Sequence, residues 1–283
     1  METEIKKVIV AGAGVMGAGI AQVAAQSGYK VQLFDINQTM LDKGMEGINK
    51  QLDKAISLGK MQQSEKSSVL KNIDLSSDLS NCRGDIIIEA VVEKLEIKVQ
   101  IFKQVLENNP AIILATNTSS IPITKIAAQV DKPHKVIGIH FFNPAHIMRL
   151  VEIIQGAQTS EDVKNKSYLF VKSLKKTPIF AKDAPGFIVN RVARHFYVES
   201  LKILEEQVAD VSTIDNLMKT NGFKMGAFEL MDLIGVETNL KVTESMFTLF
   251  NNDEKFRPSR IQQQKVDAGY FGRKTKKGFY DYE

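Results

Sequence analysis

Three glycines between a strand and a helix constrain the fold of this chain more than any other feature. Gly12, Gly14 and Gly17 form the sequence GAGVMG, which follows the apolar run VIVAG and precedes a segment with helical periodicity. Gly28 is a natural stop for that helix, and VQLFD then reads as a second strand that ends in Asp35. This order predicts a βαβ unit whose backbone N–H groups approach a pyrophosphate at the start of the helix.

The acidic residue at the end of the second strand points to NAD as the ligand. Asp35 lies roughly 20 residues beyond the loop, where a carboxylate accepts hydrogen bonds from an adenosine ribose. Ile36 and Asn37 follow it, with no arginine beside it, so its charge would repel the 2′-phosphate of NADP. Val15 and Met16 of the loop belong to the same predicted site. The alternative is that the glycines only permit tight packing of helix on strand.

The next part of the chain continues to alternate strand and helix signals. Residues 37–72 are lysine-rich and helical in pattern, and Gly59 divides them, which predicts an inserted helical hairpin. A further helix is expected over residues 161–175. Short apolar runs typical of buried parallel strands occupy residues 85–90, 112–117, 135–141, 149–154 and 178–183. These signals predict an α/β, Rossmann-like, doubly wound fold with a mostly parallel sheet.

Strand signals stop near residue 183, and the pattern beyond it is helical. One long helix is expected over residues 185–206 and another over residues 225–247. A length of 283 residues also favours two domains. We therefore predict a dinucleotide-binding domain over residues 1–184 and a smaller, all-helical C-terminal domain over residues 185–283.

Composition excludes several classes of protein. Hydrophobic residues make up 43% and charged residues 25%, as in ordinary globular proteins, and the net charge of +4 is not gathered in a basic block that would bind nucleic acid. No apolar segment or presequence opens the chain, so we expect a cytoplasmic protein with no membrane association. The single cysteine, Cys82, is expected to be a small core residue. His134, His146 and His195 lack metal-ligand spacing, and no metal is expected.

Polar side chains gather just after the predicted strands, where open α/β sheets bind their ligands. The run NTSS at residues 117–120 follows one strand, His140 and Asn143 mark the end of another, and Glu152 lies in the next. A histidine is a natural base for an alcohol, and a carboxylate at its other nitrogen fixes the tautomer. His140 and Glu152 are therefore a candidate pair. The alternatives are a structural histidine, a solvated glutamate and a helix-capping turn at NTSS.

Seven motifs occur in a fixed order: GAGVMG, the acidic end of the second strand, NTSS, HFFNP, LVEI, PGFIVNR and GRKTKKGFYDY. In this order they resemble the 3-hydroxyacyl-CoA dehydrogenases, above all the bacterial 3-hydroxybutyryl-CoA dehydrogenases. The resemblance covers essentially the whole chain. It implies NAD-dependent oxidation of (S)-3-hydroxyacyl-CoA, of short chain length, and a homodimer formed through the helical domain.

The resemblance also implies roles for individual residues. His140 would be the general base and Glu152 its orienting partner, while Ser119 and Asn190 would position the substrate. Besides the glycine loop and Asp35, the implied cofactor contacts are Glu93, Lys98, Ser119, Asn143 and Lys274. Two departures from the family pattern put the acyl-chain preference in doubt: residues 224–227 read KMGA in place of PMGP, and His146 replaces the proline after HFFNPA.

Lysines of the predicted hairpin offer a site for the phosphates of coenzyme A. Lys43, Lys50 and Lys54 are spaced to share one helical face, and we choose Lys50 and Lys54 as CoA contacts. The alternative is a solvated face of an amphipathic helix.

Two other functions stay open at this point. A related dehydrogenase with the same cofactor domain could act on a hydroxy acid without CoA, since a fold does not fix a substrate. The family is also similar to a lens crystallin, so a non-catalytic protein is the third possibility. The intact set of Ser119, His140, Glu152 and Asn190 argues against it.

Overall fold

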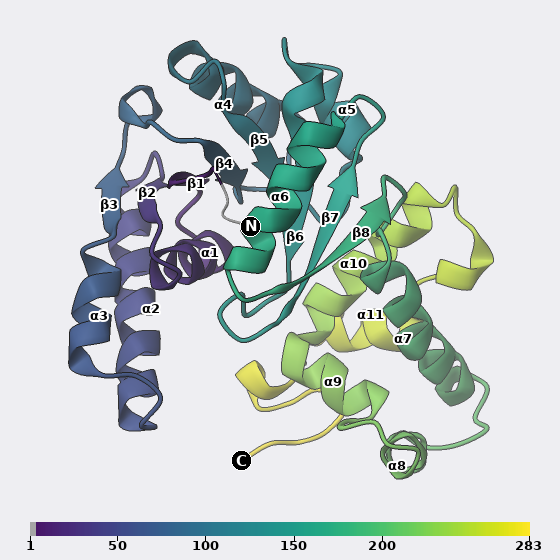
Figure 1. The fold of residues 1–283 in the computed structure, drawn as a ribbon. Coiled ribbons are helices and arrows are strands. Elements are labelled where there is room, and N and C mark those ends of the chain that lie inside the picture. Colours follow the sequence, from purple (N-terminus) through teal and green to yellow (C-terminus); the bar gives the residue numbers. More distant parts are fainter. Residues whose placement is uncertain (1–3) are drawn as a thin grey trace. The chain divides into compact units, whose positions relative to one another are not determined.

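The computed structural model describes residues 4–283, and the chain divides into two compact units, residues 1–184 and 185–283 (Figure 1). Residues 1–3, on which the expectation about a leader segment partly falls, lie outside the described residues. None of the described helices has the length and apolar character needed to cross a lipid bilayer.

The first unit is built on one eight-stranded sheet with the strand order β3-β2-β1-β4-β5-β6-β7-β8. Strands β1 to β6 are parallel, β7 is antiparallel to β6, and β8 is parallel to β7. Strand β1 has β2 on one side and β4 on the other, so the strand order reverses at β1, and the carboxyl ends of β1 and β4 mark the place where open α/β sheets bind their ligands. The strands are β1 (Lys7–Ala11), β2 (Lys30–Phe34), β3 (Ile73–Ser76), β4 (Ile86–Glu89), β5 (Ile113–Thr116), β6 (Val136–Phe141), β7 (Leu150–Gln155) and β8 (Thr177–Lys182).

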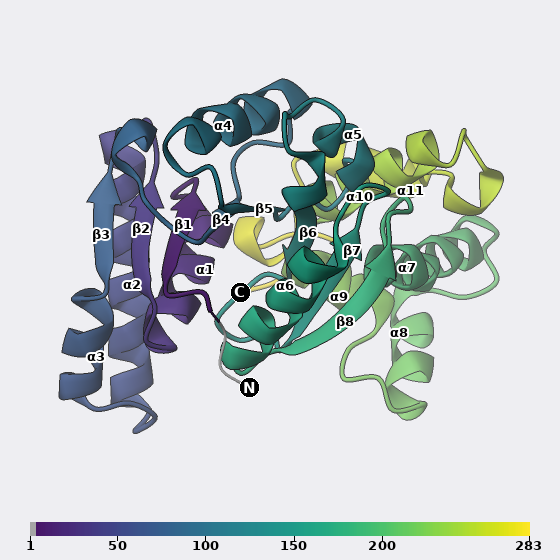
Figure 2. The ribbon, with the colours of Figure 1, turned by 45° about the horizontal axis from the view of Figure 1, so that its top comes forward.

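Helices cover both faces of this sheet, which explains why its central strands read as continuous apolar runs. Figure 2 shows α1 and α6 on one side of the sheet and α4 and α5 on the other. Alternate strand residues such as Val8 and Val10 pack with Ile20 of α1 and Phe170 of α6 in one core. The helices are α1 (Val15–Gln26), α2 (Gln38–Ser57), α3 (Gln63–Leu70), α4 (Leu95–Asn108), α5 (Ile123–Ala127) and α6 (Glu161–Ser173).

The second unit is helical apart from two isolated β-bridges near its end. Its helices are α7 (Val189–Glu205), α8 (Val211–Thr220), α9 (Ala227–Ile234), α10 (Val236–Leu249) and α11 (Arg260–Asp267). The prediction of an α/β Rossmann-like sheet followed by a helical domain is confirmed.

Three local predictions need correction. The helix expected over residues 225–247 is two helices, because Gly235 between α9 and α10 has φ +106°, outside the helical region. The helix expected from residue 185 begins only at Val189, since Gly186 and Phe187 both have positive φ. Strand β3 was not expected; its four residues form the edge of the sheet beside β2.

Candidate active site

The glycine loop lies between β1 and α1, at the carboxyl end of β1. Gly12 has φ +102°, and a Cβ there would lie 2.7 Å from the carbonyl oxygen of Ala90, just beyond β4. A Cβ on Gly17 would lie 1.7 Å from the carbonyl oxygen of Gly12, so helix and loop pack at a distance that only glycine allows. Gly14 is different, because a Cβ there would meet nothing within 4 Å. The open space at Gly14 and the uncapped start of α1 fit a pyrophosphate.

Asp35 is fixed at the end of β2 by two backbone donors. The N–H of Ala13 donates to Oδ2 at 2.9 Å and the N–H of Asn37 donates to Oδ1 at 3.0 Å. The carboxylate is therefore tied directly to the glycine loop. It has the place and the charge to accept from a ribose and to repel a 2′-phosphate.

A cavity of about 410 Å³ begins at the glycine loop. Gly14 and Val15 line it at one end, and Asn143 with the three residues after it forms another wall. Met16 is partly buried and packs against the core beside the loop. Helix α2 closes the cavity with Met40, Lys43, Gly44, Gly47, Ile48 and Gln51. The cavity thus joins the predicted cofactor loop to the lysine-bearing helix.

His140 and Glu152 face each other across the antiparallel pair β6–β7. The two residues are register partners, and Nδ1 of His140 lies 2.7 Å from Oε2 of Glu152. His140 is buried and Glu152 has no exposed area. The ring of Phe142 packs against the imidazole with centroids 4.6 Å apart. The two side chains that the sequence suggested as a pair are therefore in contact, because residues 12 positions apart become neighbours when β7 runs antiparallel to β6.

Ser119 lies in the loop that follows β5, beside β6. Thr116 of β5 pairs with Gly138 of β6, and the two strands are parallel. Two residues further along, Thr118 therefore lies level with His140, and Ser119 is the next residue in the chain. Asn117 bridges to the same strand, since its Oδ1 accepts from the N–H of Phe141 at 2.8 Å. The loop therefore places Ser119 at the same edge of the sheet as the His140–Glu152 pair.

Glu93 and Lys98 belong to an ionic network that also contains Glu89, which sequence reasoning missed; Lys98 and Glu89 are buried, and Glu93 is partly exposed at its outer end. Lys98 is 1% exposed, and its Nζ lies 2.8 Å from Glu89 Oε1 and 3.0 Å from Glu93 Oε2. Burial raises the pKa of Glu93, but the charge of Lys98 and the hydrogen bonds that the carboxylate accepts outweigh this and hold its pKa below the usual value. The ammonium of Lys98 is thus held between carboxylates. The sequence feature that could have identified Glu89 is a glutamate as the last residue of an otherwise apolar strand.

Asn190 and Lys274 lie in the second unit. Asn190 is in the first turn of α7, and Lys274 lies in a short 3₁₀ turn where its ammonium pairs with Glu237. On α2, the side chain of Lys50 is 82% exposed and lies 3.9 Å from Glu46, and Lys54 is exposed as well. Buried Cys82 is the small core residue that was expected.

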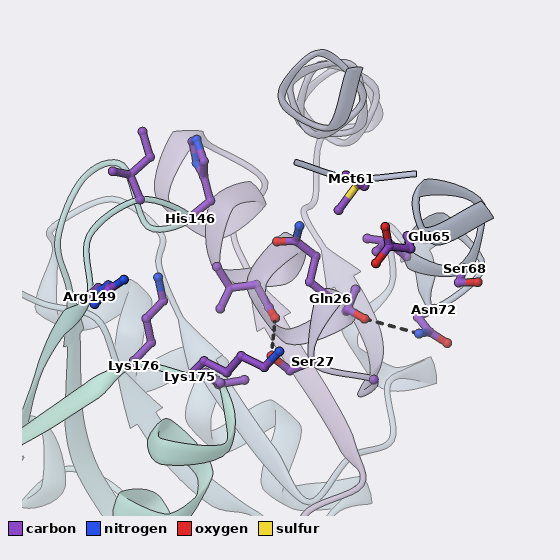
Figure 3. A pocket seen from close by; sticks show the side chains of 16 residues that line it. Gln26, Ser27, Met61, Glu65, Ser68, Asn72, His146, Arg149, Lys175 and Lys176 are labelled. Carbon is purple, nitrogen blue, oxygen red and sulfur yellow. Dashed lines mark hydrogen bonds between the residues drawn. The ribbon is translucent and has the colours of Figure 1, made fainter. Parts of the chain in front are cut away.

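A larger cavity, of about 670 Å³, lies at the other end of α1 and holds none of the predicted catalytic residues. Figure 3 shows Arg149, Lys175 and Lys176 on one of its sides and Glu65 on the other. Lys176 has a structural task there, because its Nζ donates to the carbonyl oxygens of Ala145 at 2.6 Å and Met148 at 2.8 Å. The smaller cavity is the one that contains the predicted cofactor loop, through Gly14, Val15 and Asn143. Among residues 4–283 no cluster of His, Cys, Asp and Glu could hold a metal ion.

His146, which replaces the family's proline, lines both cavities. Burial lowers its pKa below the usual value, and the charges of Lys176 and Lys54 lower it further. The other departure, at residues 224–227, lies at the start of α9. Gly226 is packed there against Asp215, with the built Cβ 2.1 Å from its carboxyl carbon.

Comparisons with known proteins cover almost the whole chain. Residues 7–184 match the family model of the 3-hydroxyacyl-CoA dehydrogenase NAD-binding domain, and residues 186–282 match that of the C-terminal domain. The chain is 41% identical over 287 residues to a 3-hydroxybutyryl-CoA dehydrogenase of Bradyrhizobium diazoefficiens, covering 100% of this chain and 97% of the relative.

A 3-hydroxyadipyl-CoA dehydrogenase of Escherichia coli is 42% identical over 285 residues, and the chain spans only 60% of that protein's length. Among solved structures, an (S)-3-hydroxybutyryl-CoA dehydrogenase from Ralstonia eutropha superposes with a TM-score of 0.93 at 40% identity, covering 99% of this chain and 100% of that one. The chain belongs to the 3-hydroxyacyl-CoA dehydrogenase family.

Proposed function

We propose that this protein is an NAD-dependent dehydrogenase that oxidises (S)-3-hydroxyacyl-CoA thioesters to 3-oxoacyl-CoA and catalyses the reverse reduction. Short substrates such as 3-hydroxybutyryl-CoA are the expected class, in line with the names of the relatives. The observation that carries the proposal is the buried His140–Glu152 pair at the ligand-binding edge of a sheet that also bears an NAD-type glycine loop.

In this proposal His140 is the general base. Its Nε2 takes the proton of the 3-hydroxyl group, while Glu152 at Nδ1 holds the tautomer and stabilises the imidazolium that forms. NAD, when bound, supplies the acceptor for the hydride that leaves C3. In the reduction, the imidazolium returns its proton to the oxygen at C3.

The remaining roles follow from the family pattern. Ser119 holds the reacting oxygen and Asn190 positions the acyl chain. Asp35, Glu93, Asn143 and Lys274 contact the cofactor with the glycine loop. For Lys98 the buried network supports an indirect role, because its ammonium is already bound by two carboxylates.

Coenzyme A is assigned to the side of the first unit that bears α2. The cavity between the glycine loop and α2 has Met40, Ile48 and Pro144 in its walls, which suits the weakly polar pantetheine arm. Lys50 and Lys54 on the same helix are exposed and suit its phosphates.

One assay tests the proposal. NADH absorbance is followed after addition of acetoacetyl-CoA and, in a parallel sample, of free acetoacetate. Oxidation with the thioester alone is expected. Equal rates with both compounds would favour a hydroxy-acid dehydrogenase that does not use CoA. Absence of oxidation with either compound would favour a non-catalytic family member.

A homodimer and a cytoplasmic location are proposed as well. The family pattern pairs the helical domain of one subunit with that of another. A single cysteine that is buried and unpaired fits a reducing compartment. Sedimentation of the purified protein tests the first of these proposals, and a tagged copy seen in cells tests the second.

A further inference from the structure

Glu89, at the carboxyl end of β4, accepts hydrogen bonds on both of its carboxylate oxygens, and every partner is a donor. Oε1 accepts from the N–H of Val91 and from Lys98 Nζ, both at 2.8 Å. Oε2 accepts from the hydroxyl of Thr116 at 2.7 Å and from Lys98 Nζ at 3.0 Å. Glu89 has no exposed area. A glutamine here would set an amide N–H against the ammonium of Lys98 whichever way the amide is turned, because Lys98 contacts both carboxylate oxygens.

Lys98, which Glu89 holds in place, also binds Glu93. Its Nζ lies 3.0 Å from Oε2 of Glu93, whose Oε1 accepts from the hydroxyls of Thr118 and, at 2.9 Å, of Ser120. These two residues flank Ser119. Glu93 therefore holds the loop on both sides of the residue assigned to the reacting oxygen.

The other arm of the network reaches the start of the same loop. The hydroxyl of Thr116, while donating to Glu89, accepts from the N–H of Thr118 at 3.2 Å. The carbonyl oxygen of Glu89 accepts from the N–H of Asn117 at 2.8 Å. The carboxylate of Glu89 thus reaches the start of the segment 117–120 through Thr116 and its end through Lys98 and Glu93, while the bond from Asn117 goes to the main chain of Glu89 and does not depend on its side chain.

We propose that Glu89 is a positioning residue: through Lys98 and Glu93 on one arm and Thr116 on the other, it fixes the loop that carries Ser119. The inference rests on the proposed function, in which Ser119 holds the oxygen at C3. In this proposal the buried Lys98 connects the carboxylates of Glu89 and Glu93.

The decisive experiment is a double-mutant cycle with Glu89→Gln and Ser119→Ala. Glu89→Gln alone is expected to lower kcat for acetoacetyl-CoA reduction about 10- to 100-fold, the usual loss when a reacting group is displaced by about 1 Å. In the Ser119→Ala background it should lower kcat by less than about 2-fold, because the residue it positions is gone. Equal losses in both backgrounds would overturn the proposal.

Two further variants guard against a general loss of structure. Thr116→Val breaks one arm without burying an unpaired charge, and its smaller loss of kcat should also vanish in the Ser119→Ala background. Glu96→Gln, at an exposed glutamate in the first turn of α4, should leave kcat unchanged. Thermal unfolding of each variant shows whether the fold is kept.

Hydrogen exchange gives a readout that does not depend on activity. Without any ligand, Glu89→Gln should speed exchange of the backbone amides in residues 117–121, while Glu96→Gln should not. Unchanged amide exchange in residues 117–121 would contradict the proposal that Glu89 holds this loop, even if kcat changed. A wild-type protein that fails to oxidise NADH would refute the proposed function, whereas faster exchange in Glu89→Gln would still support the link.

Discussion

Glu152→Gln is the substitution that isolates the contribution of the carboxylate behind the histidine. The glutamine has the same shape, so the sheet register and the packing around the residue can stay as they are. What changes is the charge 2.7 Å from Nδ1 of His140, inside a site that water hardly reaches. A glutamine N–H pointed at Nδ1 would also place the ring proton on Nε2, the nitrogen assigned as base.

The size of the effect follows from that hydrogen bond. A hydrogen bond to a charged group is worth about 1.5–3 kcal/mol. If this is the extra stabilisation of the imidazolium in the transition state, kcat should fall about 10- to 150-fold, since about 1.4 kcal/mol corresponds to a factor of ten. The affinity for NADH should change by less than about 2-fold, because the carboxylate acts in the chemical step.

The assay compares steady-state kcat for acetoacetyl-CoA reduction with the dissociation constant of NADH from fluorescence quenching. Glu107→Gln, an exposed glutamate on α4 of the same unit, is the matched control and should behave as wild type. A Glu152→Gln enzyme with wild-type kcat and an intact fold would refute the assignment of the pair.

Three other outcomes are expected. Asp35→Arg should shift cofactor preference from NADH toward NADPH, measured as the ratio of kcat/KM values, since it removes a repelling carboxylate and adds a phosphate partner; an unchanged ratio would count against Asp35. Lys50→Ala with Lys54→Ala should raise KM for acetoacetyl-CoA about 3- to 10-fold, more at low salt, with kcat kept, as exposed charge pairs contribute little each; an unchanged KM would leave their helix as a solvated face. Burial and the hydrogen bond to Asp232 raise the pKa of Tyr282 to about 12 from 10. The neutral phenol thus stabilises the folded state below pH 10, and this stability is lost as the pH rises toward 12. Tyr282→Phe should flatten that alkaline limb in thermal unfolding, and a parallel curve would contradict the reasoning.

The sheet was predictable because its strands are buried on both faces and its first turn carries three glycines. The runs that became β4, β5 and β6 are apolar except near their carboxyl ends, and helices cover both of their faces (Figure 2). Strand β3 escaped prediction because it lies at the edge of the sheet, where its sequence IDLS carries polar residues, whereas the equally short β4 and β5 are central and mostly apolar. The break at Gly235 escaped because helical periodicity continues on both sides of it.

In the candidate site, too, some residues were predicted from the sequence and others were missed. His140 and Glu152 were found from their residue types and from strand ends, and antiparallel pairing then made them partners. Glu89 was missed because its partner Lys98 lies nine positions further along the chain, on a helix. Only the packing of α4 on the sheet brings that ammonium to the end of β4. Contacts of this kind depend on tertiary structure, and local patterns do not report them.

His140→Ala tests the central claim most directly. Removal of a general base usually costs about 10²- to 10⁴-fold in rate. We therefore expect kcat for acetoacetyl-CoA reduction to fall by at least about 100-fold, with the NADH dissociation constant unchanged. A folded His140→Ala protein that reduces the thioester at nearly the wild-type rate would contradict the account.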